Sequence, residues 1–128
     1  MKPLPQSVTD QELIDVVHEW VRLLEAREYD KAFALTDHED ASWSPSLLRE
    51  FIEGYGDAEP NQGVTLLGAP TDVTQRIEVS RWPESHGKVG DVWYDLNING
   101  FASDITATFF IRVVPGGIVL SLNDVHVM

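Results

Sequence analysis

The chain has 128 residues, of which 43% are hydrophobic, and its 21 acidic and 9 basic side chains give a formal net charge of −12. This length and composition predict one soluble domain over residues 1–128, large enough to form a core without cross-links. The absence of cysteine excludes disulfides, thiolate catalysis and zinc sites built on sulfur. Because a negative field repels phosphate backbones, we expect no nucleic-acid partner.

No apolar run approaches the roughly 18 residues that a transmembrane helix needs. Residues 1–8 also lack the basic and apolar regions of a signal peptide. We therefore expect a cytoplasmic protein with no membrane partner. The sequence contains neither a phosphate loop nor an HExxH helix, and we expect no cofactor and no metal.

Residues 1–8 contain two prolines and are expected to form an extended lead-in. Thr9 and Glu12 then form a T-x-x-E capping box, with Val8 and Leu13 at the positions of a hydrophobic staple. This pattern predicts that the first helix begins here. Its apolar residues recur at steps of three and four, at Leu13, Ile14, Val17, Trp20, Val21 and Leu24.

Two shorter helices are predicted next. One covers residues 29–35 and ends at the acidic stretch 36–40. Ser44 and Pro45 are typical of an N-cap followed by a first-turn proline, so a third helix should begin there. The side chains expected on its buried face are Leu47, Leu48, Phe51, Ile52 and Tyr55.

From residue 64 onward the apolar periodicity changes from helical to alternating, which is typical of strands. The predicted strands are residues 64–69, 72–82, 91–98, 101–114 and 117–128. Residues 83–90, which contain His86, are expected to form a flexible loop. The predicted fold class is α+β, with three N-terminal helices packed on a curved, mostly antiparallel sheet.

The Asn99-Gly100 pair is typical of a two-residue hairpin turn, which sets a register with Ile98 opposite Phe101. The side chains on this face are nearly all Leu, Ile, Val and Phe, so the helices should cover it. In the last strand the alternation slips by one residue, which predicts a bulge at residues 123–124.

The same register places Asp95 opposite Asp104 and Trp93 opposite Thr106 on the polar face, and the bulge sets His126 beside Thr106. We expect these five side chains to form one patch. The two carboxylates would share a proton, hold a cation or attract a basic partner. The interpretation that we favour is that both aspartates point into water and are screened at little cost.

The segment HEWVRLLEAREYDKAFALTDHEDASWSP, residues 18–45, resembles the NTF2-like superfamily, in particular its ketosteroid isomerases and SnoaL-type cyclases. The resemblance implies a cystatin-like roll with a cone-shaped pocket. It places the catalytic aspartate of the isomerases at Ser44 and their oxyanion-hole tyrosine at Trp20. Neither replacement supplies that chemistry, because a serine hydroxyl is no unassisted general base and an indole N–H does not usefully release its proton.

The resemblance also places the acidic turn at the mouth of the cone. The ligand-pocket residues predicted from it are Trp20, Asp37, His38, Asp40, Trp43 and Ser44. Residues 99–128 are similar to small bacterial NTF2-like proteins, some of them suspected immunity proteins, which favours protein binding.

We therefore expect a non-catalytic binding module whose partner is a protein, such as a basic toxin, or a small apolar ligand. The alternative is a small-molecule isomerase, lyase or hydrolase that uses Asp37, His38 or Asp40 at the cone mouth. Since NTF2-like domains commonly dimerise through the sheet, the face that holds Trp93 is also a candidate homodimer interface.

Overall fold

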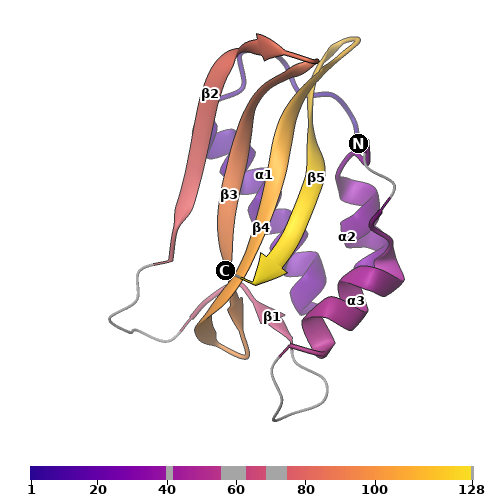
Figure 1. Ribbon diagram of the computed structural model, residues 1–128, viewed down its shortest axis with the longest axis vertical. Helices are drawn as coiled ribbons and strands as arrows, with labels where there is room; N and C mark the ends of the chain where they lie inside the picture. Colours follow the sequence, from indigo (N-terminus) through magenta and orange to yellow (C-terminus); the bar gives the residue numbers. More distant parts are fainter. Residues whose placement is uncertain (40–41, 56–62, 69–74, 128) are drawn as a thin grey trace.

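The computed structural model describes residues 1–39, 42–55, 63–68 and 75–127. Three helices precede five strands: α1 (Asp10–Glu25), α2 (Tyr29–Leu35), α3 (Pro45–Glu53), β1 (Val64–Thr65), β2 (Ile77–Ser85), β3 (Lys88–Ile98), β4 (Phe101–Val114) and β5 (Gly117–Val127). The predicted α+β class is confirmed, because the three helices pack against one open antiparallel sheet (Figure 1).

Two helices begin at the caps that the sequence predicts. At α1 the Thr9 hydroxyl accepts a hydrogen bond from the Glu12 backbone N–H, and the Glu12 carboxylate accepts one from the Thr9 backbone N–H. At α3 the Ser44 hydroxyl accepts from the backbone N–H of Leu47, and a proline follows in the first turn. Local sequence therefore decides where these helices start.

The predicted buried face of α3 is wrong at one residue. Leu47 is 44% exposed, whereas its neighbour Leu48 is fully buried. Successive residues of a helix with 3.6 residues per turn point in directions more than a quarter turn apart. The short helix α3 buries only the stripe that contains Leu48 and Ile52, so Leu47 falls outside it.

The sheet has the order β1–β3–β4–β5, and β2 also pairs with β3. β1 and β2 share one edge of β3, with β1 opposite Ile98 and Asn97 and β2 beginning opposite Tyr94. The strand predicted at residues 64–69 is therefore only two residues long, because β2 occupies the rest of that edge. Of the strand predicted at residues 72–82, residues 72–74 lie outside the described part of the chain.

The expected flexible loop at residues 83–90 is instead a tight hairpin. Ser85 pairs with Lys88 across His86 and Gly87, which both adopt the left-handed conformation, with φ of 53° and 79°. Turns of this kind match the twist of antiparallel strands. Pro83 does not prevent the pairing because β2 is an edge strand, where a missing N–H is tolerated.

Two predicted features of the sheet are confirmed. Ile98 faces Phe101 across the Asn99-Gly100 turn, whose residues have φ of 51° and 81°. The register between β4 and β5 shifts by one residue at positions 123–124, which is the predicted bulge.

A second irregularity separates Asp95 from its predicted partner. β4 has two more residues than β3 opposite Leu96, and the Ser103 hydroxyl donates a hydrogen bond to the Leu96 carbonyl at 2.7 Å. Beyond this bulge Asp95 faces Thr106 rather than Asp104, and Trp93 faces Thr108 rather than Thr106, so both predicted pairs are wrong. Because the shift is of two residues, the paired side chains on both sides of the bulge keep their predicted face.

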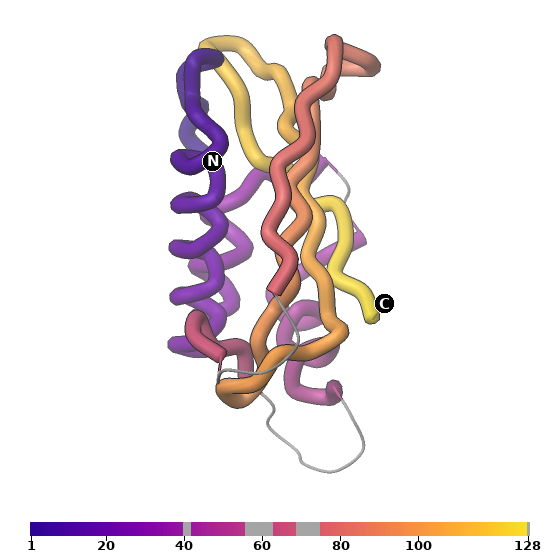
Figure 2. The backbone as a smooth tube through the Cα atoms, turned by 90° about the vertical axis from the view of Figure 1, so that its left-hand side faces the viewer, coloured from indigo at the N-terminus to yellow at the C-terminus, as the bar shows by residue number. Residues whose placement is uncertain are grey.

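The helices cover the predicted face of the sheet. α1 lies behind the sheet in Figure 1 and along one side of it in Figure 2, and α2 and α3 lie beside β5. The strand residues buried on this face include Val92, Tyr94, Leu96, Ile98, Ile105, Ala107, Phe109 and Ile111. No described helix lies over the opposite face, which is turned toward the viewer in Figure 1.

Two short segments cover part of the outer edge of β5. Leu4 pairs with Ile118 in the antiparallel sense, and Asp37 pairs with Ser121 in the parallel sense. Covering an edge strand removes a row of unpaired backbone groups that would otherwise pair with another chain. The segment after α2 is thereby brought onto the sheet.

Candidate functional site

The residues predicted to line a cone-shaped pocket do not converge where the structure describes them. Trp20 is 0% exposed and packs edge-on against Phe109, with ring centroids 5.1 Å apart. Trp43 is partly buried and packs edge-on against Phe51 at 6.1 Å. Both tryptophans thus supply packing area. Asp40 lies outside the described residues.

His38 and Ser44 are both engaged with their own neighbours in the chain. The His38 ring stacks on Phe33, with centroids 3.5 Å apart, and its Nε2 contacts the Phe33 carbonyl oxygen. The Ser44 hydroxyl is the N-cap acceptor of α3. His38 therefore contacts the C-terminal part of α2, and Ser44 caps the start of α3.

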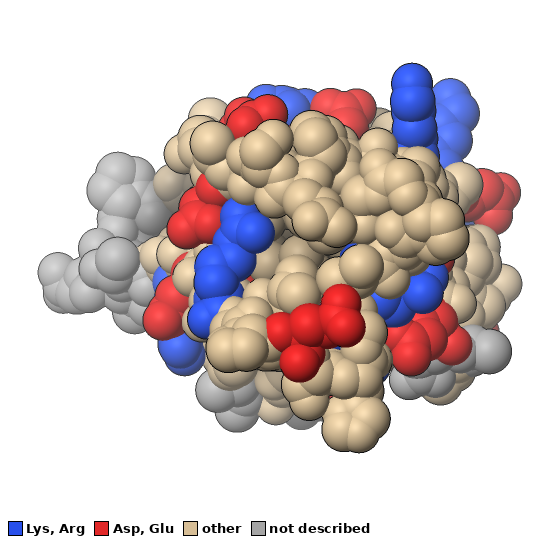
Figure 3. Space-filling model, turned by 90° about the horizontal axis from the view of Figure 1, so that it is seen from above, with Lys and Arg blue, Asp and Glu red and all other residues tan. Residues whose placement is uncertain are grey.

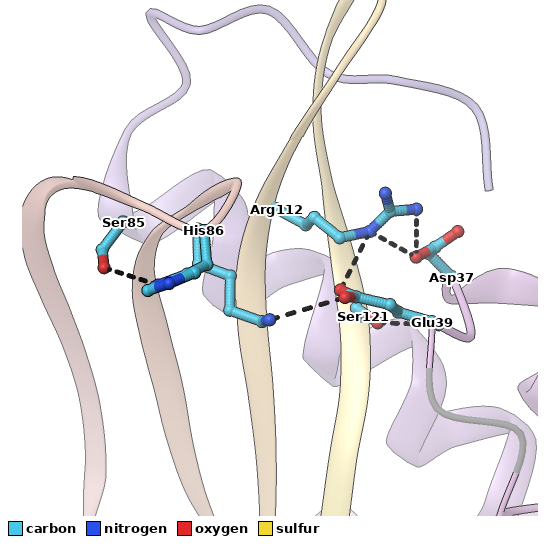
Figure 4. A network of polar contacts seen from close by, with 7 residues as sticks. Asp37, Glu39, Ser85, His86, Arg112 and Ser121 are labelled. Carbon is cyan, nitrogen blue, oxygen red and sulfur yellow. Dashed lines mark hydrogen bonds and ion pairs between the residues drawn. The ribbon is translucent and has the colours of Figure 1, made fainter.

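Asp37 lies against the sheet edge, not at the mouth of a cone. Its backbone N–H donates to the Leu120 carbonyl at 2.8 Å, and its carbonyl accepts from the Leu122 N–H at 3.0 Å. Its Oδ2 accepts hydrogen bonds from Nε and Nη2 of Arg112 at 2.9 and 2.6 Å (Figure 4). This carboxylate ties the segment after α2 to β4 and β5.

The contacts of Asp37 extend into a network through Glu39. The Glu39 backbone N–H donates to the Ser121 hydroxyl at 3.2 Å, and its carboxylate oxygens lie 3.6 Å from Arg112 Nε and 3.5 Å from Lys88 Nζ. Figure 4 shows the carboxylates of Asp37 and Glu39 both reaching the Arg112 guanidinium. Two carboxylates and two cations neutralise one another here, so this cluster is a structural ion-pair network.

On the uncovered face of the sheet the predicted patch forms around Asp95. Its Oδ1 accepts hydrogen bonds from Trp93 Nε1 at 2.8 Å and Thr106 Oγ1 at 2.9 Å. Its Oδ2 accepts from the backbone N–H of Arg76 at 3.1 Å. Three donors hold this carboxylate in one orientation, and the carboxylate in turn fixes the indole ring of Trp93.

Asp104 is the member of the predicted patch that the structure places elsewhere. It accepts a hydrogen bond from the Tyr55 hydroxyl, and this bond, followed by burial, raises the pKa of Tyr55. The predicted pair of carboxylates for a cation is therefore not formed. Among the described residues no group of three or more His, Asp or Glu side chains is arranged to hold a metal.

Two further side chains enclose the Trp93 ring. His126 packs edge-on against it, with ring centroids 6.0 Å apart, and the Arg76 guanidinium lies over it at 4.3 Å in a cation–π contact. Arg76 also pairs with Glu78 at 2.7 Å, and His126 Nδ1 lies 3.2 Å from the Asp124 carboxylate. The sequence prediction missed Arg76, Glu78 and Asp124. The pairing of β2 with β3 and of β5 with β4 brings them to this face, and the sequence did not predict the first of these pairings.

We call this cluster the Trp93 patch. It consists of Arg76, Glu78, Trp93, Asp95, Thr106, Asp124 and His126.

The surroundings of the Trp93 patch are acidic. Asp91 lies one row along β3, and burial, followed by the charge of Glu78, raises its pKa. Lys88 and Arg112 approach the same face, but each is paired with a carboxylate of the Asp37 network. Acidic groups therefore dominate the electrostatic field that an approaching molecule meets.

A separate pocket of about 450 Å³ lies at the end of the molecule, where residues 6–8 meet the β2–β3 and β4–β5 hairpins. Figure 3 looks onto this end and shows charged side chains around a largely uncharged centre. Its lining includes Trp82, Val89 and Val113, and none of the predicted pocket residues. The charged side chains of Arg81 and Glu84 also line it, so the pocket is of mixed character.

Comparisons with known proteins identify one family. A family profile with the description "Domain of unknown function (DUF7668)" matches residues 21–128. No curated protein and no solved structure matches the chain. Within the described residues, no helix combines the length and the apolar character that crossing a membrane requires.

Proposed function

This chain belongs to the DUF7668 family, and we propose that it is a non-catalytic module that binds a basic protein partner through the Trp93 patch. The observation that carries the proposal is the position of Asp95, which fixes Trp93 on a sheet face without a described helix over it. Tryptophan is among the residues most enriched in interface hot spots.

The geometry supports binding because Trp93 is held in one orientation before any partner arrives. The indole nitrogen is bound to Asp95, the ring face carries Arg76, and the ring edge meets His126. A side chain that is already ordered loses little conformational entropy when a complex forms. More of the contact energy is then available for affinity.

Charge favours a basic protein as the partner. The chain has a net charge of −12, and Glu78, Asp91 and Asp124 surround the Trp93 ring. A field of this sign accelerates encounters with positively charged surfaces and weakens as salt is added. A basic toxin neutralised by this chain would fit, as would any protein with a compact basic surface.

The same charge disfavours a homodimer through this face. A twofold interface brings the same surface of both copies together, and here that contact would place the carboxylates around Trp93 against their own copies. Like charges at short range oppose association. We therefore favour a heterologous partner over the homodimer that a sheet face of this kind also allows.

We further propose that the fold is an NTF2-like roll, a reading supported by three helices that precede a curved antiparallel sheet. In that superfamily the isomerase chemistry would fall at Trp20 and Ser44. Here Trp20 is a core residue and Ser44 caps a helix. Both roles support a member of the roll without isomerase activity, as does the engagement of Asp37 by Arg112.

The test begins with capture of partners on the wild-type chain and on Trp93→Ala, followed by purification of each candidate and calorimetric measurement of binary binding. We expect the partner to be basic and Trp93→Ala to weaken binding at least about tenfold, the size of a hot-spot contact. Phe101→Ala is the matched control, because Phe101 is an aromatic side chain 60% exposed at a hairpin tip.

Two results would contradict the proposal. The first is a purified partner whose affinity is equal for wild type, Trp93→Ala and Phe101→Ala. The second is a wild-type dimer in sedimentation velocity that Trp93→Ala converts to a monomer, because the patch would then be a homodimer interface. Loss of affinity with rising salt separates an electrostatic partner from an apolar one.

A further inference from the structure

A second pocket lies in the helical layer, on the other side of the sheet from the Trp93 patch. It measures about 330 Å³, sits where the α1–α2 corner meets α3, and is lined by Arg27, Tyr29, Lys31 and Arg49 together with the first turn of α3. An adjoining pocket of about 490 Å³ shares Arg27, Tyr29 and Arg49. Three cations thus gather around one hollow of a strongly acidic chain.

One carboxylate holds two of these cations side by side. Glu53 lies 3.6 Å from Arg27 Nη1 and 2.9 Å from Arg49 Nε, and only 15% of its side chain is exposed. Glu53 therefore holds the two guanidinium groups close together at the pocket. Within the described residues Arg49 bonds only through Nε, which leaves its terminal N–H groups able to donate to a ligand.

The backbone at Arg27 is unusual for an arginine. It follows the last turn of α1 with φ of 58°, a left-handed conformation that glycine normally adopts at this position. A side chain larger than that of glycine is strained there. Arginine at this position supplies the guanidinium that meets Glu53 at the pocket.

Tyr29 lines the same hollow and brings a buried hydroxyl close to it. The residue is 7% exposed, and within the described part of the chain its buried hydroxyl makes no hydrogen bond of full geometry, although the Glu53 carboxylate lies near it. Burial, followed by the charge of Glu53 and a weaker contribution from a hydrogen bond to it, raises the pKa of this hydroxyl, so the hydroxyl stays protonated beside Glu53. Buried polar groups without partners are rare in folded proteins, and each calls for an explanation.

Taken together, these groups point to a ligand that is small and negatively charged. We propose that the pocket binds the carboxylate or phosphate group of a small molecule, with Arg49 and Arg27 as charged donors and the Tyr29 hydroxyl as a neutral one. Planar guanidinium groups suit both oxyanions because they donate two parallel hydrogen bonds. The first turn of α3, at Ser46, adds the partial positive charge of a helix N-terminus.

The rim also contains acidic residues, which set the size of the ligand. Glu28 and Asp30 line the pocket, and Glu28 is paired with Lys31 at 3.0 Å. A large polyanion would meet these carboxylates, whereas a compact oxyanion between the two arginines would not. Nucleic acid is therefore not the ligand that this site favours.

Titration of the isotopically labelled full chain with sodium phosphate and with sodium malonate, followed by NMR at constant ionic strength, tests the proposal. We expect saturable shifts of the backbone amides of Tyr29, Ser46 and Arg49 with at least one of the two anions. Saturation by phosphate alone identifies a phosphate-bearing ligand, and saturation by malonate alone identifies a carboxylate-bearing one. Saturation by both supports an oxyanion site that accepts either group.

Two variants locate the binding in this pocket. Arg49→Gln should weaken it about tenfold or more, as expected for a lost hydrogen bond to a charged group. Arg22→Gln is the matched control, because Arg22 is an exposed arginine of α1 paired with Glu19 and does not line this pocket. Equal weakening by both variants, or shifts that saturate with neither anion, would overturn the proposal.

Tyr29→Phe tests the hydroxyl separately from the charges. It should weaken anion binding about threefold or more, while the thermal midpoint measured without anion falls by less than about 4 °C, because Glu53 keeps Arg27 and Arg49 as its partners. A fall of that midpoint by about 4 °C or more would mean that the hydroxyl already has a partner within the chain. The proposed role of Tyr29 would then be wrong.

Discussion

Asp95 accepts the indole N–H of Trp93 at 2.8 Å, although the two residues stand only two positions apart on the same strand. Side chains at this spacing point to the same face of a sheet, so the bond runs along β3 rather than across it. The same carboxylate oxygen also accepts from Thr106 on the neighbouring strand at 2.9 Å. Asp95 therefore links the orientation of Trp93 to the register of the hairpin.

Asp95→Ala should destabilise the fold by about 2–3 kcal/mol. Thr106 is 1% exposed, and without Asp95 its hydroxyl and the Trp93 indole N–H both lose their acceptor. Urea unfolding followed by circular dichroism measures the change in the free energy of unfolding. Glu50→Ala on the exposed side of α3 serves as the control and should change it by less than about 0.5 kcal/mol.

The pair formed by Asp37 and Arg112 should show an energetic coupling of about 1–2 kcal/mol in a double-mutant cycle of alanine substitutions. Their side chains are only 24% and 27% exposed, and two guanidinium nitrogens bind one carboxylate oxygen. These features place the pair above the range of exposed salt bridges. A coupling near zero would show that Asp37 does not fasten the segment after α2 to the sheet.

Two adjacent leucines of α3 should respond differently to truncation. Leu48→Ala removes a fully buried side chain and should cost about 2–5 kcal/mol of unfolding free energy. Leu47→Ala truncates a side chain that is 44% exposed and should cost less than about 1 kcal/mol. Chemical denaturation of the two variants measures the difference directly, and equal losses would mean that α3 is rotated about its axis.

All three tyrosines of the chain should ionise at higher pH in the folded protein than in the unfolded one. The pKa of Tyr29 and of Tyr94 is raised chiefly by burial, and that of Tyr55 chiefly by its hydrogen bond to Asp104, in each case from the usual 10.0. Tyrosinate absorbance during a spectrophotometric pH titration measures these transitions. The same titration in concentrated guanidinium chloride provides the unfolded reference.

The raised tyrosine pKa values also determine the alkaline limit of stability. Folding favours the neutral hydroxyls, so their contribution is complete below the unfolded value of 10.0 and is lost as the pH rises through the folded values. Tyr55→Phe should remove the Tyr55 part of this alkaline loss. A native tyrosine that titrates at or below pH 10 would contradict the buried and hydrogen-bonded environments described above.

The hydrophobic pattern could not reveal the register that decides the Trp93 patch. The bulge opposite Leu96 moves β4 by two residues, and a shift of two leaves every side chain on its original face. The alternation of apolar and polar residues is identical before and after such a shift. The sequence therefore predicted the correct face for Asp95, but not that Asp95 faces Thr106.

Features that depend on a few adjacent residues were determined by the sequence alone. The capping box at Thr9, the N-cap at Ser44 and the turn at Asn99-Gly100 are each decided by hydrogen bonds or backbone preferences within four residues. The alternation of apolar residues likewise determined which face of the sheet the helices cover. These signals are local, so the rest of the chain is not needed to interpret them.

Tertiary structure alone decided which distant side chains meet. Asp37 pairs with Arg112 across 75 positions of the chain, Arg76 reaches the ring of Trp93 through the register of β2, and Arg27 joins Arg49 at Glu53. Each contact depends on the relative positions of whole helices and strands. Hydrophobic packing and strand pairing over the full chain determine those positions. Nothing in the residues next to Arg76 or Arg27 encodes the position of its partner.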